Sequence, residues 1–187
     1  SFWLQFCENR GAVAGLIILS FIIVLALGAD WVAPYSPIEQ FRDFTKLPPV
    51  WVEGGQSRFL FGTDALGRDT LSRLIYGARI SLFIGLTVMI VSIIVGIGLG
   101  LLSAALGGLV DVAIMRVMDL ILSVPGLVLA ILIVAVLGPN LTNTIVAVTV
   151  VFLPRYVRLV RASALSELGK DYVIASKVAG AGTLRLM

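Results

Sequence analysis

The sequence predicts an all-α membrane protein that crosses the bilayer several times. Of its 187 residues, 59% are hydrophobic and 13% are charged, whereas about 25% of the residues of a typical soluble domain are charged. Several uncharged stretches are each as long as a membrane span, and glycine and proline separate them. We therefore expect four transmembrane helices in this chain, with a loop outside the membrane after the first helix.

The first span is expected within residues 11–29, which carry no charge. About 19 residues, at a rise of 1.5 Å each, nearly match the roughly 30 Å of the hydrocarbon core. A cleaved signal peptide is the alternative, because Ala26, Leu27 and Gly28 resemble a cleavage site. The apolar part of a signal peptide is shorter, at about 7 to 15 residues. We therefore assign residues 1–29 to an N-terminal segment and a retained membrane anchor.

Residues 30–79 are expected to form a loop outside the membrane, because prolines and glycines interrupt any regular pattern before residue 56. The last part of the loop is predicted to be a short amphipathic helix at the membrane interface. Asp69 can cap this helix, and apolar residues follow at positions 71, 74, 75 and 78. Asp69 and Arg73 are four residues apart, which predicts an ion pair between them.

A second span is expected in the uncharged residues 80–110. Within it a small residue recurs at every fourth position: Ser92, Gly96, Gly100, Ala104 and Gly108. Such a stripe allows another helix to approach closely, and small residues favour helix association in lipid. Glycine is also common in membrane helices generally, so the regular spacing is what favours a packing seam.

Two further spans are expected after the charged positions Asp111, Arg116 and Asp119. The third covers residues 112–137 with a bend near Pro125, and the fourth begins at Leu141. Arg116 and Asp119 lie three residues apart, so they are predicted to pair on one helix face. A charge this close to the membrane is either functional or part of a structural ion pair, and the spacing permits both.

The basic residues predict the orientation of the chain. They are concentrated after the fourth span, whereas the turn at residues 138–143 carries no charge. The residues that carry this positive charge are Arg155, Arg158, Arg161, Lys170, Lys177 and Arg185. Because loops rich in Lys and Arg remain on the cytoplasmic side, the N-terminal and C-terminal ends of the chain are expected in the cytoplasm. Residues 80–187 would then form the membrane core and its cytoplasmic extension.

A short polar helix is expected after Gly169, with Asp171 as its N-cap. Tyr172, Ala175, Ser176 and Ala179 share one face of this helix, and Gly180, Ala181 and Gly182 allow the chain to turn. Small side chains on a helix outside the membrane allow a partner to come close. The alternative is a helix that rests on lipid headgroups, although such a helix needs large apolar side chains on its buried face.

Composition excludes several classes of function. The chain has one cysteine and no histidine, so a metal site or hydrolase chemistry is not expected. The basic residues lie beside apolar spans, where they anchor the membrane topology, and nucleic acid is therefore not an expected partner. Gly169 and Lys170 are followed by Asp171 and lack the upstream glycine of a phosphate-binding loop. No cofactor and no catalytic residue is expected on this chain.

Two motifs resemble a known family. The segment DYVIASKVAGAG resembles the cytoplasmic coupling loop of ABC importer permeases, which begins Glu-Ala-Ala and has a glycine four residues after the second alanine. Ala175, Ser176 and Gly180 fit that pattern, whereas Ile174 occupies the position of the glutamate. The segment FGTDALGRDTLSRLIYGARISL is similar to the signature of permeases for dipeptides, oligopeptides and nickel. With APYSPIEQFRD and RYVRLVRASAL, the likeness extends over nearly the whole chain and is greatest to dipeptide permeases.

The resemblance implies a bacterial inner-membrane permease of six spans, of which this chain supplies four. It implies a homologous second permease, two ATPases that hold ATP and Mg, a periplasmic or lipid-anchored binding protein, and a peptide substrate. The implied residues of contact with the ATPase are Asp171, Tyr172, Ala175, Ser176, Lys177, Gly180, Ala181 and Gly182. The periplasmic signature comprises Gly62, Thr63, Asp64, Gly67, Arg68, Asp69, Ser72, Arg73, Gly77 and Arg79.

Other functions remain open from the sequence. An importer of nickel or another small solute would share these motifs. A transporter driven by an ion gradient would be expected to carry charged residues within its spans, and residues 120–154 carry none. A membrane scaffold could use the small-residue seam to oligomerise. The signature segment is expected either to face the binding protein and the outer gate or only to anchor the second span.

Overall fold

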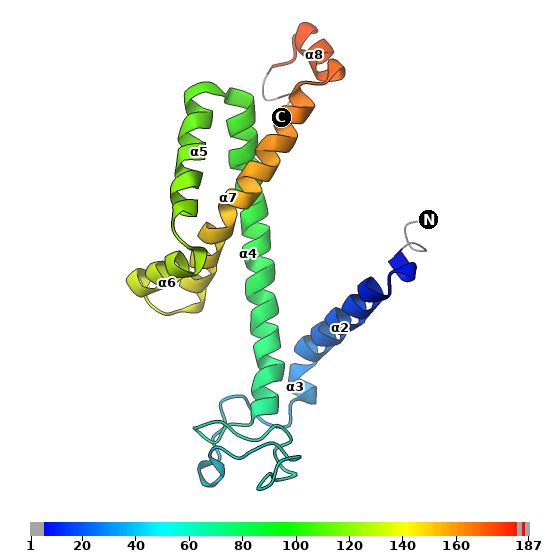
Figure 1. Cartoon of the computed structure of the whole chain (residues 1–187), viewed down its shortest axis with the longest axis vertical. Coiled ribbons are helices and arrows are strands. Elements are labelled where there is room, and N and C mark those ends of the chain that lie inside the picture. The colour runs from blue at the N-terminus through cyan, green and yellow to red at the C-terminus, as the bar shows by residue number, and fades with distance from the viewer. Residues whose placement is uncertain (1–5, 183–184, 186–187) are drawn as a thin grey trace. The chain divides into compact units, whose positions relative to one another are not determined.

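The computed structural model of the chain describes residues 6–182 and residue 185, and their regular structure is helical (Figure 1). Contacts divide the chain into two compact units, Ser1–Ile84 and Gly85–Met187, and the long helix α4 runs through the boundary. The helices, in order, are α2 (Arg10–Leu27), α3 (Ala29–Val32), the 3-10 turn η1 (Arg42–Phe44), α4 (Thr70–Leu106), α5 (Gly108–Ser123), α6 (Gly126–Leu137), α7 (Leu141–Leu168) and α8 (Asp171–Val178).

In the first unit, helix α2 is apolar around its whole circumference and is closed by polar groups at both ends. Asn9 caps its start, where the side-chain oxygen accepts a hydrogen bond from the amide of Ala12 at 3.1 Å. At its end, the guanidinium group of Arg79 in α4 donates to the carbonyl of Ala26 at 2.8 Å and to that of Leu27 at 3.1 Å. The last carbonyls of a helix have no hydrogen-bond donor within the helix. Arg79 supplies donors to two of them, which lipid could not do.

The loop between α3 and α4 is folded around a cluster of aromatic rings. Phe59 is fully buried, and its ring lies 5.1 to 5.7 Å from the rings of Tyr35, Phe41 and Phe44. The guanidinium group of Arg58 lies over this cluster, 4.7 Å from the centre of the Phe41 ring. Aromatic and cation–π contacts of this kind each contribute about 0.5 to 1.5 kcal/mol. The loop therefore has a small core of its own.

Helix α4 differs from the expected pair of an interfacial helix and a separate span. It is one helix of 37 residues, about 55 Å long at 1.5 Å per residue. No proline interrupts it, and every residue of the helix after Arg79 is uncharged. Asp69 caps its start by accepting from the amide of Ser72 at 2.7 Å. The predicted pair between Asp69 and Arg73 is wrong, because Asp69 is buried against Ser72 and Arg73 pairs with Asp64.

In the second unit, α4 packs closely against α7. A Cβ atom added to Gly96 would lie 2.6 Å from the Cβ of Tyr156, and one added to Gly100 would lie 2.7 Å from the Cβ of Val160. Both glycines are buried. Because the residue numbers rise together along the two helices, α4 and α7 run in the same direction. The chain must therefore return between them, and α5 with α6 makes this return.

The small-residue stripe is only partly a seam. Ser92 is fully buried, Gly96 and Gly100 contact α7 of the same chain, and Ala104 is half-buried. Gly108 lies outside the seam: it starts α5, is exposed and has a positive φ of 52°. The reason is the turn at Gly107, where the chain leaves α4 with a φ of 60°. Such angles favour glycine.

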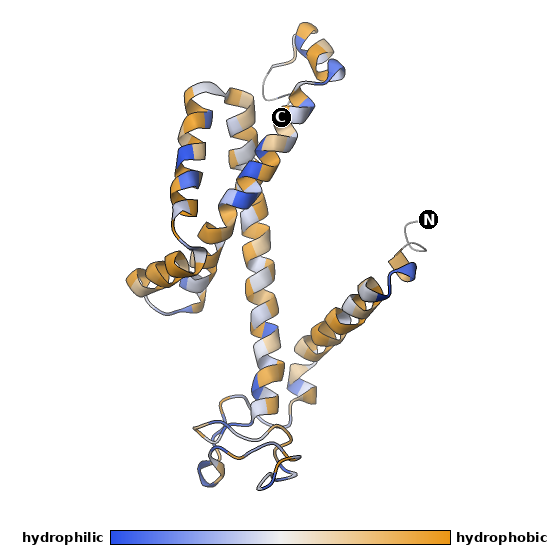
Figure 2. Cartoon of the chain, viewed as in Figure 1, coloured by the Kyte–Doolittle hydropathy of each residue, from blue (hydrophilic) through white to orange (hydrophobic). Residues whose placement is uncertain are grey.

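Fewer than four helices in the described part of the chain are by themselves long and apolar enough to be spans. By length and composition, α2 and α4 can each cross a membrane, and α5 with α6 adds a third only if this pair, bent by 93°, forms one span. The bend predicted near Pro125 is confirmed, because α5 ends at Ser123 and α6 begins at Gly126. In α7 the uncharged part before Arg155 is about 21 Å long, short of the hydrocarbon core. Figure 2 shows α2 and α6 as almost continuously hydrophobic, whereas hydrophilic positions recur on α5 and α7.

We predict that Gly100→Leu destabilises the protein by about 1 to 3 kcal/mol, because the new side chain would overlap with Val160. Thermal unfolding of the purified protein in detergent measures the effect as a lower midpoint. Gly98→Leu is the matched control, since Gly98 lies on the exposed side of the same helix and has no atom within 4 Å of its Cβ position. Equal midpoints for the two variants would contradict the close contact of α4 and α7.

Candidate functional site

The candidate site is the short helix α8, which follows α7 after Gly169 and Lys170. Lys170 is its N-cap, with an extended ψ of 148°, and Asp171 lies in the first turn. The prediction of Asp171 as the N-cap is therefore wrong by one residue, because the extended backbone falls on Lys170. Asp171 still contributes a negative charge at the positive end of the helix dipole.

One side of α8 is packed on the chain and the other is free. Val173 is buried, whereas Tyr172, Ala175 and Lys177 are exposed. Ser176 is half-buried, and its hydroxyl donates to the carbonyl of Tyr172 at 2.9 Å. The small side chain of Ala175 thus lies on a face that the described part of the chain leaves uncovered. A partner could approach the backbone of α8 closely there.

The end of α8 explains the glycine at position 180. The amide of Gly180 donates to the carbonyl of Lys177 at 3.0 Å, and that of Ala181 donates to the carbonyl of Ser176 at 3.0 Å. Gly180 has a φ of 90°. These two bonds and the left-handed residue form a Schellman motif, which ends helices and favours glycine. Gly180 therefore has a structural role in closing α8, and Gly182 follows it on the exposed surface.

Tyr172 has a partner within its own chain. Its hydroxyl donates to Oε2 of Glu167 at 2.6 Å, while Nζ of Lys170 pairs with Oε1 of the same carboxylate at 2.5 Å. The contact with Lys170, followed by that with Tyr172, lowers the pKa of Glu167. The same carboxylate raises the pKa of Tyr172. Tyr172 therefore connects the first turn of α8 to the last turn of α7.

Two ion pairs join α5 to α7, the helix that leads into α8. Arg161 binds Asp111 through two bonds, of 2.5 Å from Nε and 2.6 Å from Nη2, and the hydroxyl of Ser103 in α4 donates to the same carboxylate at 2.5 Å. Arg158 pairs with Asp119. The prediction that Arg116 pairs with Asp119 is wrong, because an arginine of α7 reaches this carboxylate instead. Sequence reasoning treated the arginines of α7 only as topology signals.

The signature segment forms a tight cradle in the loop of the first unit. A Cβ atom on Gly62 would lie 2.1 Å from the carbonyl oxygen of Leu47, and one on Gly67 would lie 2.2 Å from that of Phe41. Both glycines have a positive φ, of 71° and 73°. Thr63 is buried between them, and its hydroxyl accepts from the amide of Leu47 at 3.0 Å. Side chains larger than hydrogen do not fit at Gly62 or Gly67.

Asp64 is the polar centre of this cradle. Its carboxylate accepts from the amides of Leu66 at 2.8 Å and Arg68 at 2.9 Å, and it pairs with the side chains of Arg68 and Arg73. Burial alone would raise the pKa of Asp64, but the hydrogen bonds and the charge of Arg68 outweigh it and lower the pKa to about 2. The carboxylate is therefore ionised at neutral pH and stabilises the loop.

The remaining signature residues connect the loop to the helices of the first unit. The hydroxyl of Ser72 donates to Asp69 at 2.6 Å and accepts from the amide of Tyr35 at 3.0 Å. Arg79 joins α4 to the end of α2 and pairs with Asp30 at 3.0 Å. Gly77 is half-buried and has no atom within 4 Å of its Cβ position. The contacts of this motif are thus those of a structural element.

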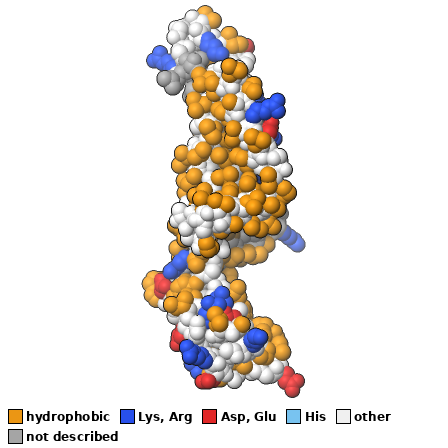
Figure 3. All heavy atoms as spheres, turned by 90° about the vertical axis from the view of Figure 1, so that its left-hand side faces the viewer, with side chains coloured by type: hydrophobic (Ala, Val, Ile, Leu, Met, Phe, Trp, Pro, Cys, Tyr) orange, Lys and Arg blue, Asp and Glu red, His pale blue; other side chains and the backbone are white. Residues whose placement is uncertain are grey.

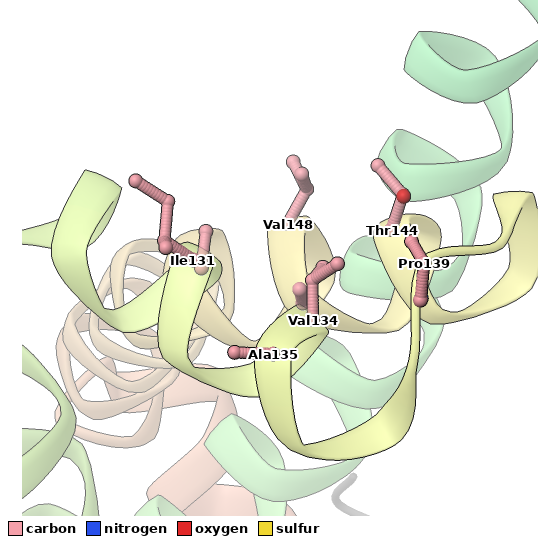
Figure 4. Close-up of a pocket in the computed structure, with 8 residues that line it drawn as sticks. Ile131, Val134, Ala135, Pro139, Thr144 and Val148 are labelled. Atoms are coloured by element: carbon pink, nitrogen blue, oxygen red, sulfur yellow. The ribbon is translucent and has the colours of Figure 1, made fainter.

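An apolar groove of about 450 Å³ lies between α6 and α7 in the second unit (Figure 4). The residues that line it are Ala130, Ile131, Val134, Ala135, Pro139, Thr144, Ala147 and Val148. Thr144 is the polar one, and its hydroxyl donates to the carbonyl of Asn140 at 2.9 Å. The residues that line the groove therefore carry no charge, and the donor of the Thr144 hydroxyl is already used within the chain. Figure 3 shows hydrophobic side chains gathered over one face of the helical part of the molecule.

The described residues contain no group of three or more acidic, cysteine or histidine side chains that could hold a metal ion. Residues 96–187 match the sequence model of the family described as binding-protein-dependent transport system inner membrane component. Residues 1–49 match that of the N-terminal transmembrane domain of oligopeptide transport permease C. Together these matches place the chain in the family of inner-membrane components of binding-protein-dependent transport systems. It is accordingly a multi-pass inner-membrane protein, and the family predicted from its motifs is confirmed.

Similar proteins match this family member over its whole length. It is 58% identical over 186 residues to the di/tripeptide transport system permease protein DppC of Pseudomonas aeruginosa, covering 100% of this chain and 61% of that protein. The dipeptide transport system permease proteins DppC of Escherichia coli K12 and Haemophilus influenzae are 52% and 48% identical over 186 residues, with 62% and 63% of their lengths covered and 100% of this chain. The chain thus spans about three fifths of the length of these relatives, which are named as permeases and not as enzymes.

We predict that the loop of this permease loses stability in acid through Asp64. Its pKa in the folded loop, about 2, lies below its ordinary value of 3.8, so its contribution is present above pH about 4 and is lost as the pH falls toward 2. The measurement is the fluorescence of Trp51, which contacts Phe61 in the loop, with the other two tryptophans replaced by phenylalanine.

Asp64→Asn should remove this acid transition and leave the loop less stable at neutral pH. Asp43→Asn is the matched control, because Asp43 is an exposed carboxylate of the same loop. An acid transition of the same size in Asp64→Asn and in the unmodified protein would show that Asp64 does not stabilise the loop.

Proposed function

We propose that this chain forms, with a homologous second permease, the membrane path of an ATP-driven importer of dipeptides and other short peptides. The observation that carries the proposal is its identity of 48 to 58%, along 186 residues, with permease proteins named for dipeptide and di/tripeptide transport. A binding protein outside the membrane would deliver the peptide. Membership of this family favours an importer over a gradient-driven transporter or a membrane scaffold.

The proposed orientation places both ends of the chain in the cytoplasm and residues 33–69 outside. Two observations support it. Helices α4 and α7 run in the same direction, so their C-terminal ends lie on one side of the second unit. The second half of α7 carries Arg155, Arg158 and Arg161, and short basic segments beside spans remain on the cytoplasmic side. On this orientation α8 is a cytoplasmic helix.

Helix α8 is proposed as the contact with one of two ATPase subunits, which would hold ATP and Mg. Its free face around Ala175 is small, which suits close docking, and residues 171–182 resemble the coupling loop of these permeases. When the ATPases close on nucleotide, they would move α8 and with it α7. The ion pairs Asp111–Arg161 and Asp119–Arg158 would carry this movement into α5. The result would be a shift between inward-open and outward-open states.

Selection of the peptide is proposed to lie mainly with the binding protein. A short peptide carries a charge at each end, and recognition of it requires groups of opposite charge. The groove between α6 and α7 is apolar, and Arg158 and Arg161 of α7 are engaged by acidic residues of α5. These surfaces suit passage of a solute better than tight binding.

We predict that Ala175→Trp abolishes ATP-dependent peptide uptake, because the indole would separate α8 from the ATPase. Uptake of a labelled dipeptide by cells that lack the native gene measures this, and co-purification of the ATPase should be lost in parallel. Ala162→Trp is the matched control, since Ala162 is exposed on α7 and should retain uptake. Normal uptake by Ala175→Trp would contradict the coupling role of α8.

Gly180→Trp is also expected to abolish uptake, because it would strain the backbone at the end of α8 and obstruct the contact with the ATPase. The φ of 90° at Gly180 strains any other residue, so the variant would disturb the end of α8 as well as its contact. Circular dichroism of the membrane spans should remain unchanged. Uptake at the normal rate by this variant would show that neither the closed end of α8 nor its contact with the ATPase is needed.

A further inference from the structure

The angle between α7 and α8 is set by two linking residues. Gly169 keeps a helical backbone, with a φ of −84° and a ψ of −4°, so the bend falls on Lys170, whose ψ is 148°. The helical angles of Gly169 do not require glycine. A Cβ atom there would have ordinary contacts, 3.8 Å from the carbonyl oxygen of Ser166. Since neither strain nor space explains this glycine, its remaining effect is to make the backbone more flexible.

One carboxylate spans this flexible joint. Glu167 lies in the last turn of α7, and its two oxygens bind Nζ of Lys170 at 2.5 Å and the hydroxyl of Tyr172 at 2.6 Å. The backbone adds one bond, from the amide of Lys170 to the carbonyl of Glu167 at 3.0 Å. Each side-chain bond crosses Gly169. Together they fix the direction in which α8 leaves α7.

We propose that Glu167 is a positioning residue that holds α8 at a fixed angle to α7 so that movement of α8 is passed to the membrane helices. The proposal rests on the coupling role proposed for α8. It also assigns Tyr172 to this internal brace, as a residue that acts through Glu167. Glu167 and Lys170 are about half exposed, and exposed ion pairs are weak. The brace therefore stabilises the angle by about as much as one exposed ion pair does.

The angle itself can be measured by the distance between two spin labels. The labels are placed at Ser163 on α7 and Val178 on α8, which are both exposed, in the full-length permease in lipid nanodiscs with Cys7 replaced by serine. We expect one narrow distribution of distances for the unmodified joint and a broader one for Glu167→Gln combined with Tyr172→Phe. Ser166→Ala, a change of an exposed neighbour, should leave the distribution narrow. An unchanged width in the double variant would overturn the proposal.

The effect on coupling is measured in the assembled transporter as ATP hydrolysed per peptide imported. Glu167→Gln should raise this ratio about two- to fivefold, the size expected for the loss of one exposed ion pair, while the ATPase still co-purifies. A broader distance distribution with an unchanged ratio would overturn the role of Glu167 in coupling. If the unmodified complex contains no ATPase, the proposed function fails, and the distance measurement alone decides whether Glu167 sets the angle.

Discussion

The close contact between α4 and α7 is the constraint on which the second unit depends. Gly96 and Gly100 remove the side chains that would hold these helices apart. In lipid, where apolar surfaces gain little by leaving their surroundings, such backbone proximity is a principal source of helix association. Because the two helices run in the same direction, their C-terminal ends lie on one side of the second unit. Helices α5 and α6 return the chain from the end of α4 to the start of α7.

Charged groups near the membrane are neutralised by residues distant in the sequence. Asp111 and Asp119 of α5 form ion pairs with Arg161 and Arg158 of α7. These pairs connect the basic half of α7 to α5. In the first unit, Arg79 provides donors to the carbonyls at the end of α2. Burying a charge without a partner is costly. These pairs therefore restrict how far α5 and α7 can move independently.

Local features of the fold could be predicted from the sequence, whereas contacts between distant residues could not. The apolar length of α2, the end of α7 at Gly169 and the family followed from composition and motifs. The ion pair of Asp111 and Arg161 joins residues 50 positions apart, and no local pattern marks such a pair. Arg116 was assigned to Asp119 by spacing alone. The continuity of α4 does not follow from local pattern, because the residues after Asp69 are amphipathic and those after Arg79 are uncharged.

The glycines of the signature segment are explained by the structure of the loop itself. Gly62 and Gly67 are required because a carbonyl oxygen occupies the space of a side chain at each position, and Asp64 is required because it joins the surrounding amides and arginines. None of these demands involves a cargo molecule. The motif therefore specifies the structure of the loop. Permeases grouped by this motif alone would include proteins that transport different solutes.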